Sequence, residues 1–432
     1  MKSTKVRSPR YRWFVLAVFF FFMLLHQADK LLIGPLTTPI METFGINEAQ
    51  MGAVFTGALI VGAVLYPVWG YLYDRYSRPK LLALASFIWG STTWLSAIAP
   101  TYPSFVVTRA TTGLDDSSYP GLFSLVSDYF GPGVRGKIYG LLQLTSPLGY
   151  VIGMVLALML GDTLGWRGVF YLTGSLGVIL AVVIFFGVRD MPRGRSEPEM
   201  AGVEEIGTYR FDWNIARGLF RKRSLLLLYL QGFFGVFPWN VIVYWVFRYL
   251  ETERNYDADA ILLTMSLAIV AMACGYFAGG AIGDALFKRT PRGRILVAIT
   301  GVILGAIILA IALNVSLENQ ALFSITLMLA AFFMPFSSAN VIASVYDITL
   351  PEVRSTALAV QYALESAGAA LAPALGGLIA VNASLKVAIL GISVTAWMLC
   401  ALFLAGVLLL IPPDIEALRR QMRQRAAHEQ RG

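Results

Sequence analysis

Three ionisable side chains follow the first apolar run of the sequence. The run reads WFVLAVFFFFMLL and continues directly into HQADKLLIGP, which places His26, Asp29 and Lys30 in a segment of membrane-spanning composition. A charge in the hydrocarbon core costs about 2.5 to 3.5 kcal/mol on insertion scales, so such residues usually line an interior cavity and find partners there. Asp29 and Lys30 follow His26 by three and four positions, which predicts that all three share one helix face.

A second charged segment, RATTGLDDSSYP, lies in the fourth apolar run. Arg109 and Asp116 are seven positions apart, or about two helical turns, so they are expected to share a face. Asp115 is expected to point roughly a third of a turn away. A desolvated carboxylate paired with a cation has a pKa that depends on its neighbours. An anionic or zwitterionic substrate that captures Arg109 or Lys30 would therefore release a carboxylate to take up a proton.

These residues predict two kinds of site. The residues assigned to proton coupling are Asp29, Asp116, Asp115 and His26. The residues assigned to substrate binding are Lys30 and Arg109 and, from the less charged second half of the chain, Gln361, Glu365 and Trp239. Three alternatives stay open: Asp116 could hold a static ion pair, Asp115 could face a helix interface or water, and His26 could be a packed structural histidine with no proton to relay.

The composition indicates a membrane protein. Of the 432 residues, 57% are hydrophobic and only 14% are charged, and the mean hydropathy is +0.67, which is more apolar surface than a water-soluble core could hide. A span needs about 20 apolar residues. The runs of that length predict an all-α protein of twelve transmembrane helices, at 13–34, 50–72, 80–99, 103–130, 138–161, 167–188, 225–248, 260–286, 294–313, 321–346, 354–381 and 386–411.

The basic residues predict the topology. The net charge is +8, and 28 of the 34 lysines and arginines fall in segments on one side of the predicted spans. The positive-inside rule assigns that side, with both termini, to the cytoplasm. The basicity therefore implies no nucleic-acid partner. No cleavable signal peptide is evident, and the short loops and tails favour the cell membrane of a prokaryote. The protein is expected to be a monomer.

The sequence contains few residues of the types that support enzymatic catalysis. The chain holds two histidines and two cysteines, too few for a metal cluster or a nucleophile with its base, so no enzyme, no cofactor and no metal site is expected. A membrane sensor that binds a ligand without transporting it remains an alternative.

The sequence divides into two halves and a linker. We expect a six-helix bundle over 1–190, a cytoplasmic linker over 191–223, and a second six-helix bundle with a basic tail over 224–432. The linker is polar and contains FDWNIARGLFRKR, in which apolar residues recur near helical spacing between arginines. This pattern predicts a short helix at the membrane interface.

Two loops repeat between the halves at nearly the same interval. The pairs Gly70/Gly280, Asp74/Asp284 and Arg78/Lys288 are 210 positions apart, and the pairs Asp128/Asp347, Pro132/Pro351 and Arg135/Arg354 are 219 apart. A duplicated six-helix unit is typical of transporters in which two halves rock about a central site.

The loop GYLYDRYSRPK, with Gly70, Asp74, Arg75, Arg78 and Lys80, resembles the signature of the major facilitator superfamily. The resemblance implies two pseudo-symmetric bundles, alternating access, and a central cavity lined by the first and fourth spans. Such a loop can form a charge-assisted latch between helices on the cytoplasmic side, although simple retention of basic residues in the cytoplasm is an alternative. Asp128 with Arg135, and Asp347 with Arg354, bracket helix ends and are expected to serve the same latch. The predicted gate residues are Gly70, Asp74, Arg75, Arg78, Asp128, Arg135, Asp284, Asp347 and Arg354.

The segments DKLLIGPLTTPI, R-x3-G-x2-acid and RSTALA resemble the Spinster-like lipid transporters and also the anion:cation symporters of organic acids. Relative to the Spinster pattern, Lys30 replaces an arginine and Asp116 replaces a glutamate. The resemblance implies a secondary transporter, with protons as the expected coupling ion, of a small amphipathic or anionic solute such as a lysophospholipid-like lipid. Symport of small organic carboxylates is the alternative.

Overall fold

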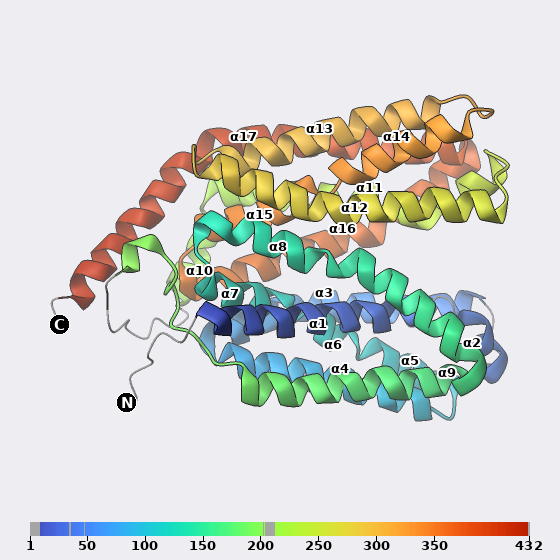
Figure 1. Cartoon of the computed structure of the whole chain (residues 1–432), viewed down its shortest axis with the longest axis horizontal. Coiled ribbons are helices and arrows are strands. Elements are labelled where there is room, and N and C mark those ends of the chain that lie inside the picture. The colour runs from blue at the N-terminus through green and yellow to red at the C-terminus, as the bar shows by residue number, and fades with distance from the viewer. Residues whose placement is uncertain (1–8, 34–35, 47, 202, 204–211, 431–432) are drawn as a thin grey trace. The chain divides into compact units, whose positions relative to one another are not determined.

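The computed structural model describes residues 9–33, 36–46, 48–201, 203 and 212–430, and the regular secondary structure of these residues is entirely helical (Figure 1). The helices in the first half of the sequence are α1 (Pro9–Leu32), α2 (Thr37–Phe44), α3 (Glu48–Arg75), α4 (Arg78–Ile98), α5 (Tyr102–Ala110), α6 (Gly113–Asp116), α7 (Tyr119–Tyr129), α8 (Arg135–Gln143) and α9 (Thr145–Gly187). Those in the second half are α10 (Trp213–Leu219), α11 (Arg223–Thr252), α12 (Ala258–Phe287), α13 (Gly293–Asn314), α14 (Gln320–Phe333), α15 (Phe336–Asp347), α16 (Arg354–Asn382) and α17 (Leu385–Glu429).

Ten helical segments among the described residues are long and apolar enough to cross a membrane. The all-helical membrane fold is thereby confirmed in outline, while the count of twelve spans and the side on which the termini lie stay predictions. Two predicted spans are missing from the ten, at 50–72 and 103–130. The first corresponds to α3, a continuous helix of 28 residues, and the second is divided among α5, α6 and α7.

The fourth predicted span is broken around the short helix α6. Thr112 N–H donates to Arg109 O at 3.2 Å and Ser118 N–H donates to Asp115 O at 2.9 Å, which are three-residue bonds in place of four-residue α-helical ones. Pro120 near the start of α7 has no N–H to continue the ladder. The argument that Arg109 and Asp116 share a face needs a continuous helix, so it does not apply across this segment.

Two helices run past the expected ends of their spans. α9 covers two predicted spans, and the chain turns inside it at Gly165, where φ is +64°. This left-handed conformation is one that glycine adopts without a steric penalty. α17 continues through Pro412 and Pro413 to Glu429, so the basic tail is helical.

The short helix predicted in the linker corresponds to α10. The Asp212 carboxylate caps this helix by accepting from two backbone N–H groups.

The contacts group the chain into two compact units. Unit 1 comprises Met1–Gly131, Thr145–Phe211 and Pro351–Ala359, and unit 2 comprises Pro132–Leu144, Asp212–Leu350 and Val360–Gly432. The predicted division at 190 and 223 stays a prediction. The units follow the two sequence halves except that each also contains a short segment from the other half, Pro351–Ala359 in unit 1 and Pro132–Leu144 in unit 2.

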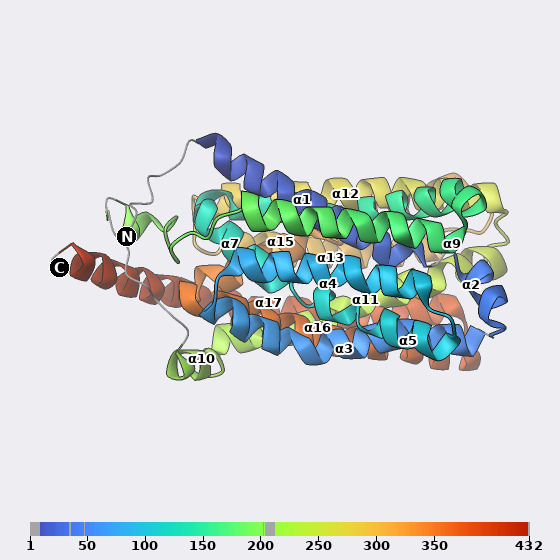
Figure 2. The same cartoon turned by 90° about the horizontal axis from the view of Figure 1, so that it is seen from below.

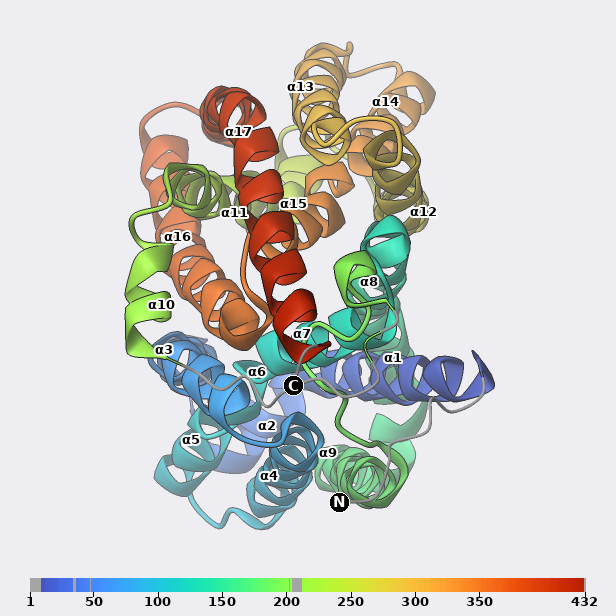
Figure 3. The ribbon, with the colours of Figure 1, turned by 90° about the vertical axis from the view of Figure 1, so that its left-hand side faces the viewer.

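In unit 1, α9 packs along both α1 and α4 (Figure 2). Its core includes an aromatic cluster of Phe105, Trp166 and Phe170, all buried. In unit 2, α17 lies beside α11 and α13, and α14 packs against α12 and α13 (Figure 3). The segment α8 packs against α12 and α15 within unit 2.

Glycine allows the close approach of α4 and α9. A Cβ atom on Gly90 would lie 2.6 Å from Gly174 O and 2.7 Å from Val178 N. We expect Gly90→Ala to lower the apparent Tm of the purified protein, because two rigid helix backbones would have to separate. The matched control is Gly391→Ala in α17, where a Cβ meets nothing within 4 Å and alanine should stabilise the helix by roughly 0.5–1 kcal/mol. Equal Tm values for the two variants would contradict the packing argument.

Candidate functional site

His26 of α1 contacts two side chains of the broken fourth span. Its Nε2 atom forms an ion pair with Asp115 Oδ2, and its Nδ1 atom lies 2.6 Å from the Tyr119 hydroxyl. The exposed fractions of His26 and Asp115 are 3% and 0%. The imidazole also stacks on Phe22 and meets the edge of Trp89, with ring centroids 6.0 and 5.4 Å apart. An imidazole and a carboxylate therefore share an interior site walled by aromatic rings.

Asp29 lies in a different contact set on the same helix. Its carboxylate accepts from the Thr173 hydroxyl at 2.5 Å and the Thr93 hydroxyl at 3.2 Å. Arg109 Nη1 is 3.7 Å from Asp29 Oδ2, and its guanidinium lies over the Phe170 ring at 5.2 Å. Asp29 and Arg109 are 2% and 4% exposed, and Arg109 Nη1 has no hydrogen-bond partner among the described residues.

The structure thus brings together some of the residues predicted to bind substrate or protons. Asp29 and Arg109 meet within unit 1, and His26 meets Asp115. The shared helix face of His26 and Asp29 does not produce a shared cluster, because the polar partners of His26 are Asp115 and Tyr119, whereas those of Asp29 lie on α4, α5 and α9. Lys30 is half-buried near the end of α1. The side chain of Asp116 lies outside the described residues.

The predicted gate aspartate Asp74 caps a helix within unit 1. It is fully buried and accepts from the backbone N–H groups of Ser355 at 3.1 Å and Thr356 at 2.6 Å, in the first turn of α16. A carboxylate at a helix N-terminus is stabilised by the unpaired amides and by the helix dipole. Gly70 permits this approach, since a Cβ there would lie 2.6 Å from the Cβ of Ala359.

A chain of buried ion pairs extends this contact in unit 1. Arg78 donates to Asp128 at 2.5 Å and to Asp190 at 2.9 and 3.1 Å. Arg354 forms an ion pair with Glu197 at 2.6 Å and lies 3.9 Å from Asp128. Because Arg–carboxylate bonds of this kind are directional and charge-assisted, they hold the start of α16 in one orientation.

Unit 2 contains an equivalent helix cap, formed on α8, which belongs to the first half of the sequence. Asp284 accepts from Gly136 N–H at 2.9 Å and Lys137 N–H at 2.7 Å, in the first turn of α8. Arg294 forms an ion pair with Asp284 at 2.8 Å and another with Asp347. Each of the two equivalent aspartates therefore caps a helix that begins in the opposite half of the sequence.

The contacts show which of the predicted gate residues meet. The sequence expectation is that Asp128 with Arg135, and Asp347 with Arg354, bracket helix ends and serve one latch. In the structure, Arg354 lies 3.9 Å from Asp128 in unit 1, and Arg135 lies 3.8 Å from Asp347 in unit 2. The partners are exchanged because the segments that start at positions 132 and 351 each pack in the unit of the other half.

The ion pairs that the described residues form around Asp74 include residues that sequence reasoning missed, and they do not include Arg75. Arg75 is exposed and donates to the Tyr71 hydroxyl. The missed residues belong mainly to the segment after α9: Asp190 and Glu197 form the ion pairs above, and Arg193 lies 3.9 Å from Asp74. Burial, and then the neighbouring Arg78 charge, lower the pKa of Arg193. The run RDMPRGRSEPE contains both basic and acidic residues, which indicates that ion pairs could form there. Nothing in the run specifies the partners of these residues.

The candidate residues of unit 2 form a smaller polar set. Gln361 Nε2 donates to Glu365 Oε1 at 2.8 Å. A Cβ on Gly232 of α11 would collide with that Nε2 atom, so the Gln361 amide lies directly against the glycine. Gln361 is 1% exposed, and its amide oxygen has no hydrogen-bond partner among the described residues. Trp239 lies about two turns further along α11 and is half-buried.

The chain is similar in sequence and in fold to known proteins. The Protein spinster of Drosophila melanogaster is 28% identical over 385 residues, which cover 86% of this chain, and the chain spans 62% of that relative's length. A probable sulfoacetate transporter of Cupriavidus necator is 27% identical over 296 residues, which cover 66% of this chain and 67% of that protein. A crystal structure of a bacterial homolog of the human lysosomal transporter Spinster, inward-facing and unoccupied, has a TM-score of 0.57 at 18% identity and covers 98% of this chain and 99% of its own.

The family model described as Major Facilitator Superfamily matches residues 15–317. That match includes the charged segments of α1 and α5–α7, the Asp74 loop and its repeat at Asp284. Since it covers more than half of the 432 residues, the chain belongs to the Major Facilitator Superfamily.

Proposed function

We propose that this chain is a secondary transporter that works by alternating access and couples protons to the movement of a small amphipathic or anionic organic solute, such as a lysophospholipid-like lipid. The observation that carries the proposal is the buried contact of His26 with Asp115 and Tyr119. Histidine is the side chain whose ordinary pKa lies nearest neutrality. Ionisable groups placed in a membrane interior generally mark a proton or substrate path.

Coupling follows from the partners of His26. While the imidazole faces Asp115 among aromatic rings, a protonated imidazole and an ionised carboxylate satisfy one another. A movement that separates them leaves each charge in poorly solvated surroundings, where the neutral forms are favoured. The carboxylate then takes up a proton from the side to which the site is open, and the imidazolium releases its proton to the opposite side. Direct transfer between the two groups would move no net proton across the membrane. Asp115 lies in the four-residue helix α6 between two turns, so a shift of this segment would make and break the contact.

Substrate recognition is assigned to Arg109 and Lys30. The 3.7 Å separation between Arg109 and Asp29 exceeds the range of a hydrogen bond, and Arg109 Nη1 has no hydrogen-bond partner among the described residues. An anionic group would supply the missing acceptor and compete with Asp29. Lys30 would contribute a second positive charge from the same helix as Asp29.

The other half of the sequence supplies the less polar candidates. Gln361 and Glu365 offer amide and carboxyl groups, and Trp239 offers an aromatic surface. A site with cations on one side and apolar surface on the other suits an amphipathic molecule. The similarity to Protein spinster supports a lipid-like solute, whereas the similarity to a probable sulfoacetate transporter supports the alternative of small organic anions.

Gating is assigned to the two capped helices. Asp74 at the start of α16 and Asp284 at the start of α8 would each hold one closed arrangement, and release of both would accompany opening. We place the protein as a monomer in the cell membrane of a prokaryote, with both termini in the cytoplasm, because its basic residues cluster on that side.

The test is proton flux into proteoliposomes that contain a pH-sensitive dye, under an imposed pH gradient. Lysophosphatidylglycerol and a panel of small carboxylates and sulfonates are added in separate arms. Wild type is expected to show flux evoked by the lysolipid, and Asp115→Asn is expected to reduce it at least tenfold, because the imidazole loses its ionisable partner. The matched variant is Asp116→Asn, one position away.

Each outcome bears on a separate part of the proposal. Flux evoked only by the carboxylates or sulfonates would replace the lipid with small organic anions. Loss of flux in Asp116→Asn but not in Asp115→Asn would overturn the role of the His26–Asp115 pair. Substrate-induced thermal stabilisation of the wild type without any proton movement would reject proton coupling.

A further inference from the structure

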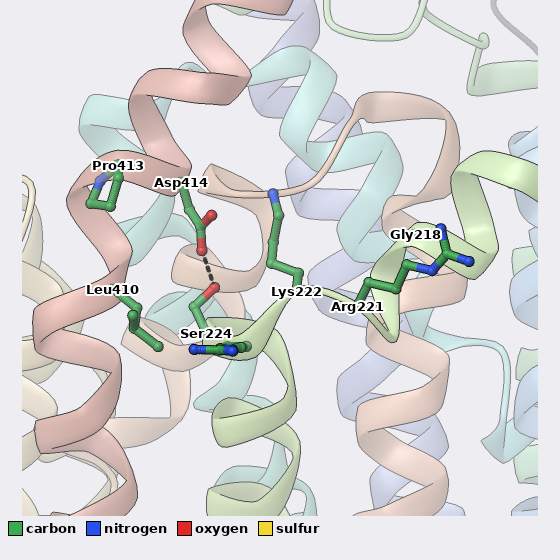
Figure 4. A pocket seen from close by; sticks show the side chains of 8 residues that line it. Gly218, Arg221, Lys222, Ser224, Leu410, Pro413 and Asp414 are labelled. Carbon is green, nitrogen blue, oxygen red and sulfur yellow. Dashed lines mark hydrogen bonds between the residues drawn. The ribbon is translucent and has the colours of Figure 1, made fainter.

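A hollow of about 460 Å³ lies between the start of α11 and the end of the apolar part of α17. Its lining is mostly basic or apolar and consists of Gly218, Arg221, Lys222, Arg223, Ser224, Leu410, Pro413 and Asp414. Figure 4 shows Arg221 and Lys222 at the junction of α10 and α11, with Leu410, Pro413 and Asp414 on α17. Three cationic side chains against one carboxylate leave the hollow positively charged.

The hollow lies where two apolar stretches end. The candidate span of α11 begins at Arg223, and the last predicted apolar run ends at 411, immediately before Pro412 and Pro413. Residues at these positions are at the depth of lipid headgroups if both helices cross the bilayer. The basic residues of the predicted linker, 191–223, assign the start of α11 to the cytoplasmic side. The cytoplasmic leaflet carries anionic lipids.

Among the described residues, the carboxylate of Asp414 offsets only part of the positive charge in the hollow. Asp414 accepts a hydrogen bond from the Ser224 hydroxyl, and Lys222 Nζ donates to Ile348 O at 2.6 Å. Burial lowers the pKa of the Lys222 ammonium, and the nearby Asp414 opposes that shift. Arg221 and Arg223 are exposed, and the described part of the chain provides neither with an ion-pair partner.

Apolar side chains flank the cations. Trp213 and Phe220, at the two ends of α10, are 62% and 54% exposed, and Leu409 on α17 is 71% exposed. Tryptophan and other aromatic rings are favoured at the headgroup level of a membrane. A basic hollow with apolar surface on one side has the polarity of a phospholipid, in which a phosphate is joined to acyl chains.

We infer that this hollow binds the phosphate headgroup of an anionic diacyl phospholipid from the surrounding bilayer, with its acyl chains along α17 at Leu409 and Leu410. Arg221 and Arg223 would contact the phosphate, and the backbone N–H groups of Arg223 and Ser224 at the start of α11 would face it. The site is separate from the His26, Asp29 and Arg109 region, so it does not depend on which solute is transported.

Native mass spectrometry of the detergent-solubilised protein, titrated with phosphatidylglycerol, tests the inference. The double variant Arg221→Gln/Arg223→Gln leaves the internal bonds of Lys222 and Asp414 intact. It is expected to bind phosphatidylglycerol at least tenfold more weakly than wild type, because each basic residue near an anionic lipid strengthens binding several-fold. The matched control, Arg419→Gln/Arg420→Gln on exposed positions of α17, removes the same charge and should change binding less than about threefold.

Two further arms distinguish binding of the whole phospholipid from binding of a phosphate group alone. Phosphatidylcholine should bind weakly to all three proteins, and inorganic phosphate or glycerol phosphate should fail to displace phosphatidylglycerol at equal concentration. Equal weakening by the two double variants would overturn the inference in favour of non-specific attraction. Displacement by free phosphate would show that the acyl chains add nothing and would likewise overturn it. The apparent Tm of each variant without lipid identifies any loss of folding.

Discussion

Asp29→Asn is expected to destabilise the protein by about 3 kcal/mol, because it leaves the Arg109 guanidinium buried without a counter-charge. Arg109 is 4% exposed, and its nearest carboxylate among the described residues is that of Asp29. Asparagine keeps the shape of the side chain, and its amide oxygen can accept from one of the Thr93 and Thr173 hydroxyls while its amide N–H group donates to the oxygen of the other. The main quantity lost is therefore the charge. The apparent Tm, measured by scanning fluorimetry at a fixed scan rate, should fall by several degrees.

The double variant Asp29→Asn/Arg109→Gln is the matched control. Removing both charges should restore most of the lost Tm, because replacing a complete buried ion pair by neutral groups costs much less than breaking it. A double variant that is less stable than Asp29→Asn would contradict this account. If Asp29→Asn keeps the wild-type Tm but loses proton flux, Asp29 is a coupling acid, and its contact with Arg109 adds little stability.

Asp74→Ala is expected to increase amide hydrogen exchange at Ser355 and Thr356 by about 30-fold or more. Both N–H groups donate to the buried Asp74 carboxylate, and losing the acceptor leaves each amide with a penalty of about 1–3 kcal/mol. The first turn of α16 should then open more often, while exchange in the middle of α16 should change little. Exchange followed by proteolysis and mass spectrometry can resolve these two regions.

The internal repeat provides a reciprocal control. Asp284→Ala should increase exchange at Gly136 and Lys137, whose N–H groups donate to Asp284, and leave Ser355 and Thr356 unchanged. Asp74→Ala should show the reverse pattern. Faster exchange at both helix starts in both variants would mean that the effect is a general loss of stability, and the assignment of each aspartate to one helix cap would fail.

Much of the fold follows from local composition. Apolar runs of sufficient length identify ten of the spans, and the loops around Asp74 and Asp284 reveal the duplication and the family. The break in the fourth span could not be placed from periodicity, because RATTGLDDSSYP contains no proline before Pro120 and reads as one helix. Its turns at 111–112 and 117–118 depend on three-residue hydrogen bonds that propensity does not specify.

The partners in the sites were harder to predict than the residues themselves. Helical spacing puts His26 and Asp29 on one face of the first span, but only the packing of α4, α6 and α9 around α1 determines that they contact different side chains. The contribution of Asp190 and Glu197 could not be found either. A polar segment between two bundles reads as a solvated linker, and nothing local indicates that its carboxylates bind Arg78 and Arg354.

The exchange of short segments between the halves has a consequence for biosynthesis. Unit 1 includes Pro351–Ala359, and Asp74 and Asp128 find partners there. When the ribosome has finished the first six helical spans, these buried carboxylates still lack part of their contacts, and they must wait for more than 150 further residues. The nascent first half is therefore expected to remain incompletely packed around Asp74 and Asp128 until translation is well into the second.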